Sequence, residues 1–185
     1  MRKLILFNMM TLDGFFAGAH GELDWHVVDE EFQTFAMQQL ESVDTLLFGR
    51  KTYQMMASYW TTEAAREKDP SIAAKMNETA KIVVSRTLDR AMWGNSKLLK
   101  EKVADEVAGM KRQPGRDMII LGSANLAATL TRNSLIDEYR IMLNPVVLGS
   151  GKPLFQVVEG SLRLKLLESR AFRSGNVLLT YALAK

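Results

Sequence analysis

The stretch LLFGRKTYQMM, Leu46–Met56, runs from three apolar residues into a glycine, a basic pair and a threonine. The apolar residues predict a buried strand over Thr45–Phe48, and the residues after the basic pair predict a helix over Thr52–Ser58. The first turn of a helix carries unpaired N–H groups and a partial positive charge, and a glycine lets a bound group approach the backbone. Such a junction suits a phosphate, and it also suits an ordinary glycine turn with two solvated cations and a capping threonine. The residues of this candidate phosphate site are Gly49, Arg50, Lys51 and Thr52.

The rest of the chain alternates between predicted strands and predicted helices. Apolar runs bounded by turn or polar residues predict strands at Leu4–Met10, Thr45–Phe48, Lys81–Ser85, Asp117–Leu121, Glu138–Leu143, Leu162–Phe172 and Asn176–Leu183. Helices are predicted at Asp29–Glu41, Thr52–Ser58, Ile72–Glu78, Lys100–Lys111 and Ala124–Arg132. The stretches Thr61–Pro70 and Leu143–Phe155 have no clear pattern. The alternation predicts βαβ units, whereas the last three strands have no helix between them.

These patterns predict one α/β domain over residues 1–185. We expect three layers, with a mostly parallel mixed sheet flanked by helices and ending in an antiparallel C-terminal hairpin. The residues Arg173–Asn176, RSGN, are the predicted turn of that hairpin.

Two further strand ends carry residues that suit a phosphate. Ser85 and Arg86 follow an apolar strand, and a hydroxyl beside a guanidinium can bind an anion, although these are also common residues for leaving a strand. The third junction joins an apolar strand to an alanine-rich helix and consists of Gly122, Ser123, Ala124, Asn125 and Leu126. Because carboxyl ends of parallel strands share one sheet edge, the three junctions together predict a dinucleotide-sized site.

Composition excludes several other classes of site. The chain has no cysteine, so disulfides and thiolate metal sites are excluded, and its two histidines, His20 and His26, are not spaced for a metal site. The 24 basic and 21 acidic residues are interspersed, which argues against a nucleic-acid partner. No apolar run is long enough for a signal core or for a membrane span, so we expect a cytoplasmic protein with no membrane partner.

The sequence resembles the dihydrofolate reductase fold, and in particular the group related to the RibD C-terminal domain, the reductase domain of bacterial riboflavin biosynthesis. The motifs that carry the resemblance are TLDGFFAG (11–18), GELDW (21–25), FGRKTY (48–53), VVSRT (83–87), IILGSANL (119–126) and DEYRIMLNPVVLGSGKPLF (137–155). The resemblance implies NADPH as cofactor, with its phosphates on Gly49, Arg50 and Thr52 and its 2′-phosphate on Ser85 and Arg86. It also implies that the pyrophosphate passes over Gly122–Leu126.

The substrate side departs from the better-known relatives. The riboflavin enzymes usually have a glutamate where this chain has Leu121, and they usually have a fused deaminase with metal-binding cysteines. Folate reductases place a carboxylate at the start of the first long helix, where this chain has Asp29, a candidate catalytic residue that is also a natural helix cap. Trp25 and Phe155 are candidate walls for an aromatic substrate, the alternative being two core residues.

We therefore expect a stand-alone NADPH-dependent reductase of a small planar heterocycle, pterin-like or pyrimidinone-like, or of a related carbonyl or imine compound. The alternative is a non-catalytic nucleotide-binding module with the same fold, and a nucleic-acid-binding domain is a distant third reading. The resemblance further implies a homodimer. The loop Asn144–Phe155, which has two prolines and allows positive φ at Gly149 and Gly151, is expected to border the active-site cleft.

Overall fold

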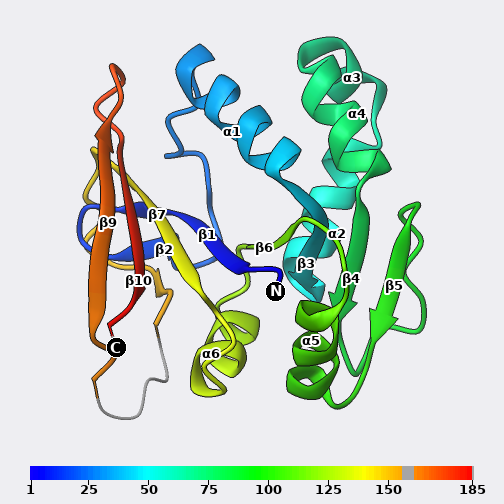
Figure 1. Ribbon diagram of the computed structural model, residues 1–185. Helices are drawn as coiled ribbons and strands as arrows, with labels where there is room; N and C mark the ends of the chain where they lie inside the picture. The colour runs from blue at the N-terminus through cyan, green and yellow to red at the C-terminus, as the bar shows by residue number, and fades with distance from the viewer. Residues whose placement is uncertain (156–160, 185) are drawn as a thin grey trace.

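The computed structural model describes residues 1–155 and 161–184, which form three layers around an eight-stranded sheet (Figure 1). The strands are β1 (Leu4–Thr11), β2 (Phe15–Ala17), β3 (Val43–Gly49), β4 (Ala80–Val84), β5 (Ser96–Leu99), β6 (Asp117–Leu121), β7 (Glu138–Asn144), β8 (Lys152–Pro153), β9 (Leu164–Ala171) and β10 (Val177–Leu183). The helices are α1 (Glu30–Ser42), α2 (Arg50–Trp60), α3 (Glu63–Lys68), α4 (Pro70–Glu78), α5 (Val103–Arg112) and α6 (Ala124–Arg132).

The order of strands in the main sheet is β5-β4-β3-β6-β1-β7-β10-β9. All neighbours from β5 to β7 run parallel, and β10 then pairs antiparallel with both β7 and β9. The predicted fold class is confirmed: a mostly parallel mixed sheet flanked by helices ends in an antiparallel C-terminal hairpin. A small second sheet pairs β2 with β8.

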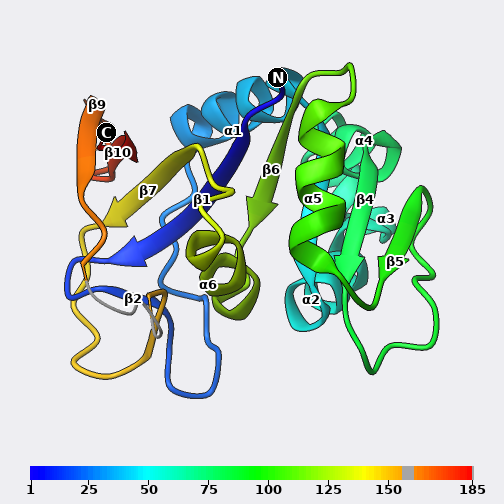
Figure 2. The same ribbon diagram turned by 60° about the horizontal axis from the view of Figure 1, so that its bottom comes forward.

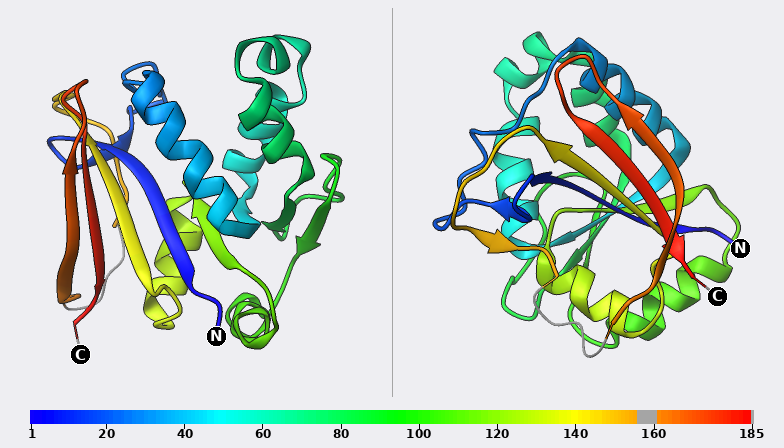
Figure 3. Two further views of the ribbon diagram at one scale, coloured as in Figure 1. Left: turned by 45° about the horizontal axis from the view of Figure 1, so that its top comes forward. Right: turned by 90° about the vertical axis from the view of Figure 1, so that its left-hand side faces the viewer.

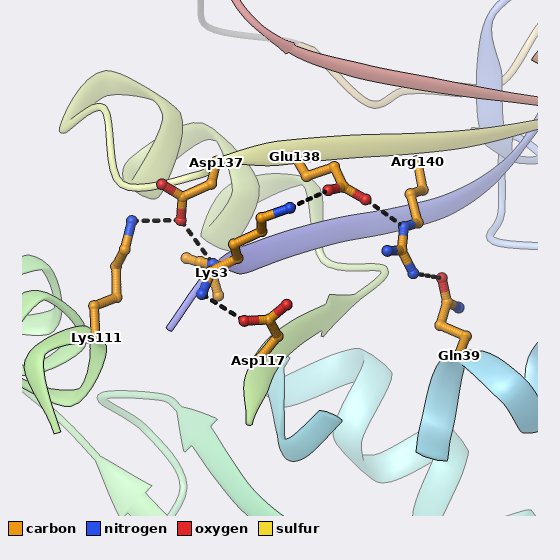
Figure 4. A network of polar contacts seen from close by, with 8 residues as sticks. Lys3, Gln39, Lys111, Asp117, Asp137, Glu138 and Arg140 are labelled. Atoms are coloured by element: carbon orange, nitrogen blue, oxygen red, sulfur yellow. Dashed lines mark hydrogen bonds and ion pairs between the residues drawn. The ribbon is translucent and has the colours of Figure 1, made fainter. Parts of the chain in front are cut away.

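The start of β1 is held between β6 and β7 by acidic side chains. The backbone N–H of Lys3 donates to Asp117 Oδ1 at 2.7 Å, and the N–H of Leu4 donates to Asp137 Oδ2 at 2.7 Å. The Lys3 ammonium also lies 3.3 Å from Glu138, the first residue of β7 (Figure 4). These contacts fix the register of β1 against both neighbours at the amino edge of the sheet.

Alternate residues of β1 belong to different core clusters, as its strand period requires. Ile5, Phe7 and Met9 pack with residues of α1, α2 and α4, whereas Leu6 and Met10 pack with residues of α5 and α6. The helices accordingly lie in two layers, with α5 and α6 on one face of the sheet and α1, α2 and α4 on the other (Figures 2 and 3). Burial on both faces explains why these strands are almost continuously apolar.

The structure also contains elements that were not predicted. Residues 61–70 contain α3, which Thr62 caps by accepting a hydrogen bond from the Ala65 N–H, and Pro70 then opens α4 at its first turn. β5 is a four-residue edge strand that pairs with β4 alone among the described strands. α2 begins at Arg50, two residues before the predicted helix, so three residues of the candidate phosphate site form its first turn.

The segment 144–155 is fastened to the segment that follows β1. The Leu12 N–H donates to Val146 O at 2.8 Å, and the Asp13 carboxylate accepts from the Gly149 N–H at 2.8 Å. Gly149 has a φ of 74°, as expected, but Gly151 does not have a positive φ. Gly151 is needed for space instead, because an added Cβ would lie 2.6 Å from the Ala17 carbonyl oxygen. This loop leaves the carboxyl end of β7, the same sheet edge as the three junctions.

Candidate functional site

Three strand ends that lie side by side carry the predicted cofactor residues. In the sheet β4, β3 and β6 are consecutive and parallel, so Ser85, Gly49 and Gly122 leave the sheet at one edge. In open α/β sheets this carboxyl edge is where ligands bind. The structure therefore brings the three junctions together, as the sequence predicted.

The starts of α2 and α6 approach each other closely. A Cβ added at Gly49 would collide with the Ser123 hydroxyl, and a Cβ added at Gly122 would lie 3.2 Å from Thr52 Oγ1. Gly122 also has a φ of 66°, a conformation that other residues rarely adopt. Both glycines thus let the two helix starts pack closely, Gly49 against Ser123 and Gly122 against Thr52.

Neither of these helix starts is capped by a side chain. Gly49 caps α2 and has no side chain, and Ser123 precedes α6 in a left-handed conformation without forming a side-chain cap bond. The first N–H groups of α2 and α6 thus lie at neighbouring helix starts without a side-chain acceptor in the described part of the chain, and both helix dipoles place partial positive charge there. The arrangement attracts an anion.

Basic side chains are exposed at the first and second junctions. Arg50 and Lys51 are exposed in the first turn of α2, and the Arg50 guanidinium donates to Thr87 Oγ1 at 2.8 Å, which links the first junction to the second. The Ser85 hydroxyl accepts from the N–H groups of Thr87 and Leu88, so it shapes the turn after β4. That turn leaves Arg86 exposed.

The third junction contributes mainly backbone. Ala124 and Leu126 are buried and pack in the core cluster under α6, whereas Asn125 is exposed. Ser123 is half-buried beside Gly49. Of this segment, the Ser123 hydroxyl, the Asn125 side chain and the backbone N–H groups are the parts that a ligand can reach.

A buried lysine near the start of β4 holds part of the segment that follows this strand. The Lys81 ammonium is fully buried, donates to the carbonyls of Asn77, Thr79 and Gly94, and lies 4.5 Å from the centroid of the Trp93 ring. Burial lowers the pKa of Lys81 to about 8. The backbone N–H of Trp93 in turn donates to the Tyr53 hydroxyl at 2.7 Å. These contacts tie the segment after β4 to α2, the helix that carries the first junction.

Asp29 is the N-cap of α1, and its Oδ1 accepts from the Phe32 N–H at 2.8 Å. Glu31, in the first turn of the same helix, is engaged elsewhere: its carboxylate accepts from the Arg173 N–H at 2.9 Å and pairs with Arg170 at 3.0 Å. The hydrogen bond from Arg173 and the contact with Arg170 hold the pKa of Glu31 below its usual value. Glu31 thus joins α1 to the C-terminal hairpin, a role that no sequence pattern indicated.

Trp25 and Phe155 pack on different faces of the sheet. Trp25 is partly buried against the cluster that contains Phe35, whereas the ring of Phe155, 41% exposed, lies 6.3 Å from that of Tyr139 in the other cluster. The structure therefore does not bring the two rings together as opposite walls of one pocket.

Two buried asparagines hold the segment that carries Trp25. The Val27 N–H donates to Asn144 Oδ1 at 2.9 Å, and the Val27 carbonyl accepts from Asn176 Nδ2 at 2.9 Å. Burial lowers the pKa of the adjacent His26 to about 4, so this histidine is neutral at pH 7. Asn144 ends β7 and Asn176 precedes β10, so the segment is fixed to the sheet at the carboxyl edge of β7.

A cavity of about 260 Å³ lies away from the three junctions, between α1 and the strands β7, β10 and β9. Its lining includes Glu138 and Arg140, in the first part of β7, together with Gln39 of α1. Arg140 donates to Glu138 at 2.7 Å and to Gln39 at 3.2 Å, so these polar groups already satisfy one another (Figure 4). The cavity is therefore not an extension of the junction site.

None of the helices in residues 1–155 and 161–184 has the length and apolar character that a membrane span requires. The same residues contain no cluster of three side chains suited to holding a metal ion.

Comparison with known proteins places this architecture in a family. The chain is 34% identical to the uncharacterized protein YyaP of Bacillus subtilis (strain 168), over 97% of this chain and 94% of that protein. The structure is similar to a putative riboflavin biosynthesis protein from Shewanella sp. PV-4, with a TM-score of 0.75, 26% identity and 99% of each chain covered. A dihydrofolate reductase from Enterococcus faecalis, solved with NADP(H), has a TM-score of 0.66 at 14% identity and covers 99% of this chain and 97% of its own. Residues 2–178 match the family described as the RibD C-terminal domain, and this chain belongs to that family.

Proposed function

We propose that this protein is a reductase that uses NADPH to reduce a small planar heterocycle, pterin-like or pyrimidinone-like, or a related carbonyl or imine compound. The observation that carries the proposal is the convergence of three junctions at one sheet edge, where two uncapped helix starts meet. Membership of the RibD C-terminal domain family and the likeness to riboflavin-related and dihydrofolate reductase structures support it.

The residues at the junctions fit a dinucleotide phosphate. Gly49 and Gly122 let the backbones of the two helix starts approach each other, because a side chain at either position would meet Ser123 or Thr52. In the proposed complex the first turn of α2, with Arg50, Lys51 and Thr52, holds phosphate oxygens, and Gly122–Leu126 supports the pyrophosphate. Arg86, exposed after β4, receives the 2′-phosphate that distinguishes NADPH from NADH. When bound, the cofactor supplies the hydride.

On the substrate side, Asp29 is the proposed proton donor and Trp25 the proposed aromatic wall. Oδ1 of Asp29 accepts the capping hydrogen bond at the start of α1, so we propose that Oδ2 is the atom that gives its proton to the substrate. The two hydrogen bonds that Asn144 and Asn176 form with the backbone of Val27 position Trp25, which lies two residues earlier in the chain. Because Phe155 packs on the opposite face of the sheet, we assign it a secondary role in substrate binding. A cytoplasmic location belongs to the same proposal.

The test of the proposed reaction is oxidation of NADPH with a panel of pterins, pyrimidinones and quinones. Steady loss of absorbance at the reduced-nicotinamide band with at least one compound is expected, and the compounds that react define the substrate class. If NADPH binds and no member of the panel reacts, the protein is instead the non-catalytic nucleotide-binding module that the sequence also permits.

Replacing Arg86 by Ala is expected to weaken binding of NADPH and to leave binding of NADH almost unchanged. A charge-assisted contact contributes about 1.5–3 kcal/mol, which corresponds to roughly 10- to 100-fold in Kd. Titration of both cofactors by fluorescence quenching measures this ratio. Arg90→Ala, which removes an exposed arginine from the same segment, is the control. Equal losses for the two cofactors would show that Arg86 does not bind the 2′-phosphate.

Asp29→Asn separates catalysis from helix capping, because asparagine caps a helix about as well as aspartate but cannot donate a proton in the same way. We expect kcat to fall by roughly 10²- to 10⁴-fold, the usual contribution of a general acid, with an unchanged melting temperature. Asp29→Ala, which removes the cap as well, should also lower the melting temperature. Full activity of Asp29→Asn would limit Asp29 to capping.

We also propose that the protein is a homodimer that pairs through its C-terminal strands. β9 has β10 as its only partner among the described strands, and it exposes Leu166 and Leu167, at 48% and 52%. Light scattering at micromolar concentration should give twice the chain mass of 20.8 kDa. Leu166→Lys should shift that mass toward the monomer, whereas a wild-type mass of one chain rules the dimer out.

A further inference from the structure

Asn8, in the middle of β1, has a buried amide group without a partner. The residue is only 4% exposed, and its Nδ2 has no hydrogen-bond acceptor among the described residues. Buried amide groups are nearly always paired, because an orphaned donor loses its hydration without compensation. Asn144, equally buried on the neighbouring strand, shows the usual situation: its amide binds the Val27 N–H and the carbonyls of Met10 and Met142.

The strand geometry places the Asn8 side chain beside the third junction. Leu6 and Met10, two residues away on either side, pack in the cluster that contains α6, so Asn8 faces the same layer. On the β7 side its partner is Ile141. On the β6 side the last pair is Phe7 with Leu121, so the next residue along, Gly122, lies beside Asn8 and brings no side chain. The amide is therefore directed toward the start of α6.

The first backbone N–H groups of α6 also lack a side-chain acceptor among the described residues. Ser123 precedes the helix with a φ of 69° and makes no side-chain cap bond, so the first N–H groups of this nine-residue helix have no capping partner. The helix dipole adds partial positive charge at the same place. Two independent features, an uncapped helix start and a buried amide donor, thus meet at Gly122 without an acceptor for either.

We propose that Asn8 is a cofactor-binding residue, and that its Nδ2 donates a hydrogen bond to a pyrophosphate oxygen of the dinucleotide lying on Gly122 and the start of α6. This inference rests on the proposed use of a nicotinamide dinucleotide. It explains the orphaned donor as a group whose partner arrives with the ligand. It also differs from the role of Arg86, because NADPH and NADH both carry the pyrophosphate, so the Asn8 contact strengthens binding of both.

The test is Asn8→Leu, which replaces the amide by an apolar side chain of similar size. In the cofactor-free protein the melting temperature should rise by about 2–8 °C, because the variant removes a buried donor without a partner. The Kd values for NADPH and NADH should both increase, by roughly 10- to 100-fold, since a hydrogen bond to a charged oxygen is lost. Thermal unfolding without cofactor and fluorescence titration with each cofactor measure the two effects separately.

Two variants serve as controls. Met10→Leu, a substitution of similar volume two residues along the same face, should change neither Kd by more than about twofold. Asn8→Ala, which introduces no larger side chain, gives the same comparison of Kd values if the leucine variant folds poorly.

The possible outcomes separate this inference from the function on which it rests. Wild-type protein that binds neither dinucleotide would refute the proposed function and the role of Asn8 with it. Wild-type binding that Asn8→Leu and Asn8→Ala leave unchanged would refute the role of Asn8 alone. Weaker binding of NADPH only, or weaker binding of both together with a lower melting temperature in each variant, would also overturn it, because the amide would then be selective or structural.

Discussion

The pairing of β1 with β6 on one side and β7 on the other is the constraint on which the rest of the molecule depends. Asp117 and Asp137 bind the first backbone N–H groups of the strand and so set its register. A slip of one residue would turn Phe7 and Met9 out of one core layer and into the other. The same register aligns the carboxyl ends of the parallel strands, and this alignment brings the helix starts of the junctions to one edge.

The sequence was most informative where structure is local. All seven predicted strands are present. The five parallel ones were visible as apolar runs because they are mostly buried, whereas β9 is largely exposed and takes its place from its pairing with β10. The junction residues could be found because strand ends and helix starts are visible in the sequence. α3 was missed because Glu63–Lys68 has no apolar stripe. β5 was missed because it is four residues long and takes its pairing from β4.

The remaining parts of the site depend on contacts between residues distant in the chain. The hydrogen bonds of Val27 with Asn144 and Asn176 join residues more than 100 positions apart. Nothing in the sequence around an asparagine at a strand end indicates so distant a partner. Trp25 and Phe155 were grouped by their chemistry, but the sheet separates them because Phe155 packs against Tyr139. Asn8 was read simply as part of a strand, since a missing hydrogen-bond partner is visible only in three dimensions.

The central place of β1 also determines how the chain can fold as it is made. Lys3 and its partner Asp117 are 114 positions apart, so β1 is synthesised well before β6 and β7, its two neighbours in the sheet. At a synthesis rate of about 5–20 residues per second, the wait for β6 is roughly 6–20 s. During that time the nascent chain exposes a segment that is fully buried in the finished protein. A circular permutation that places β1 directly before β6 in the chain would shorten this exposure without changing the pairing of the finished sheet.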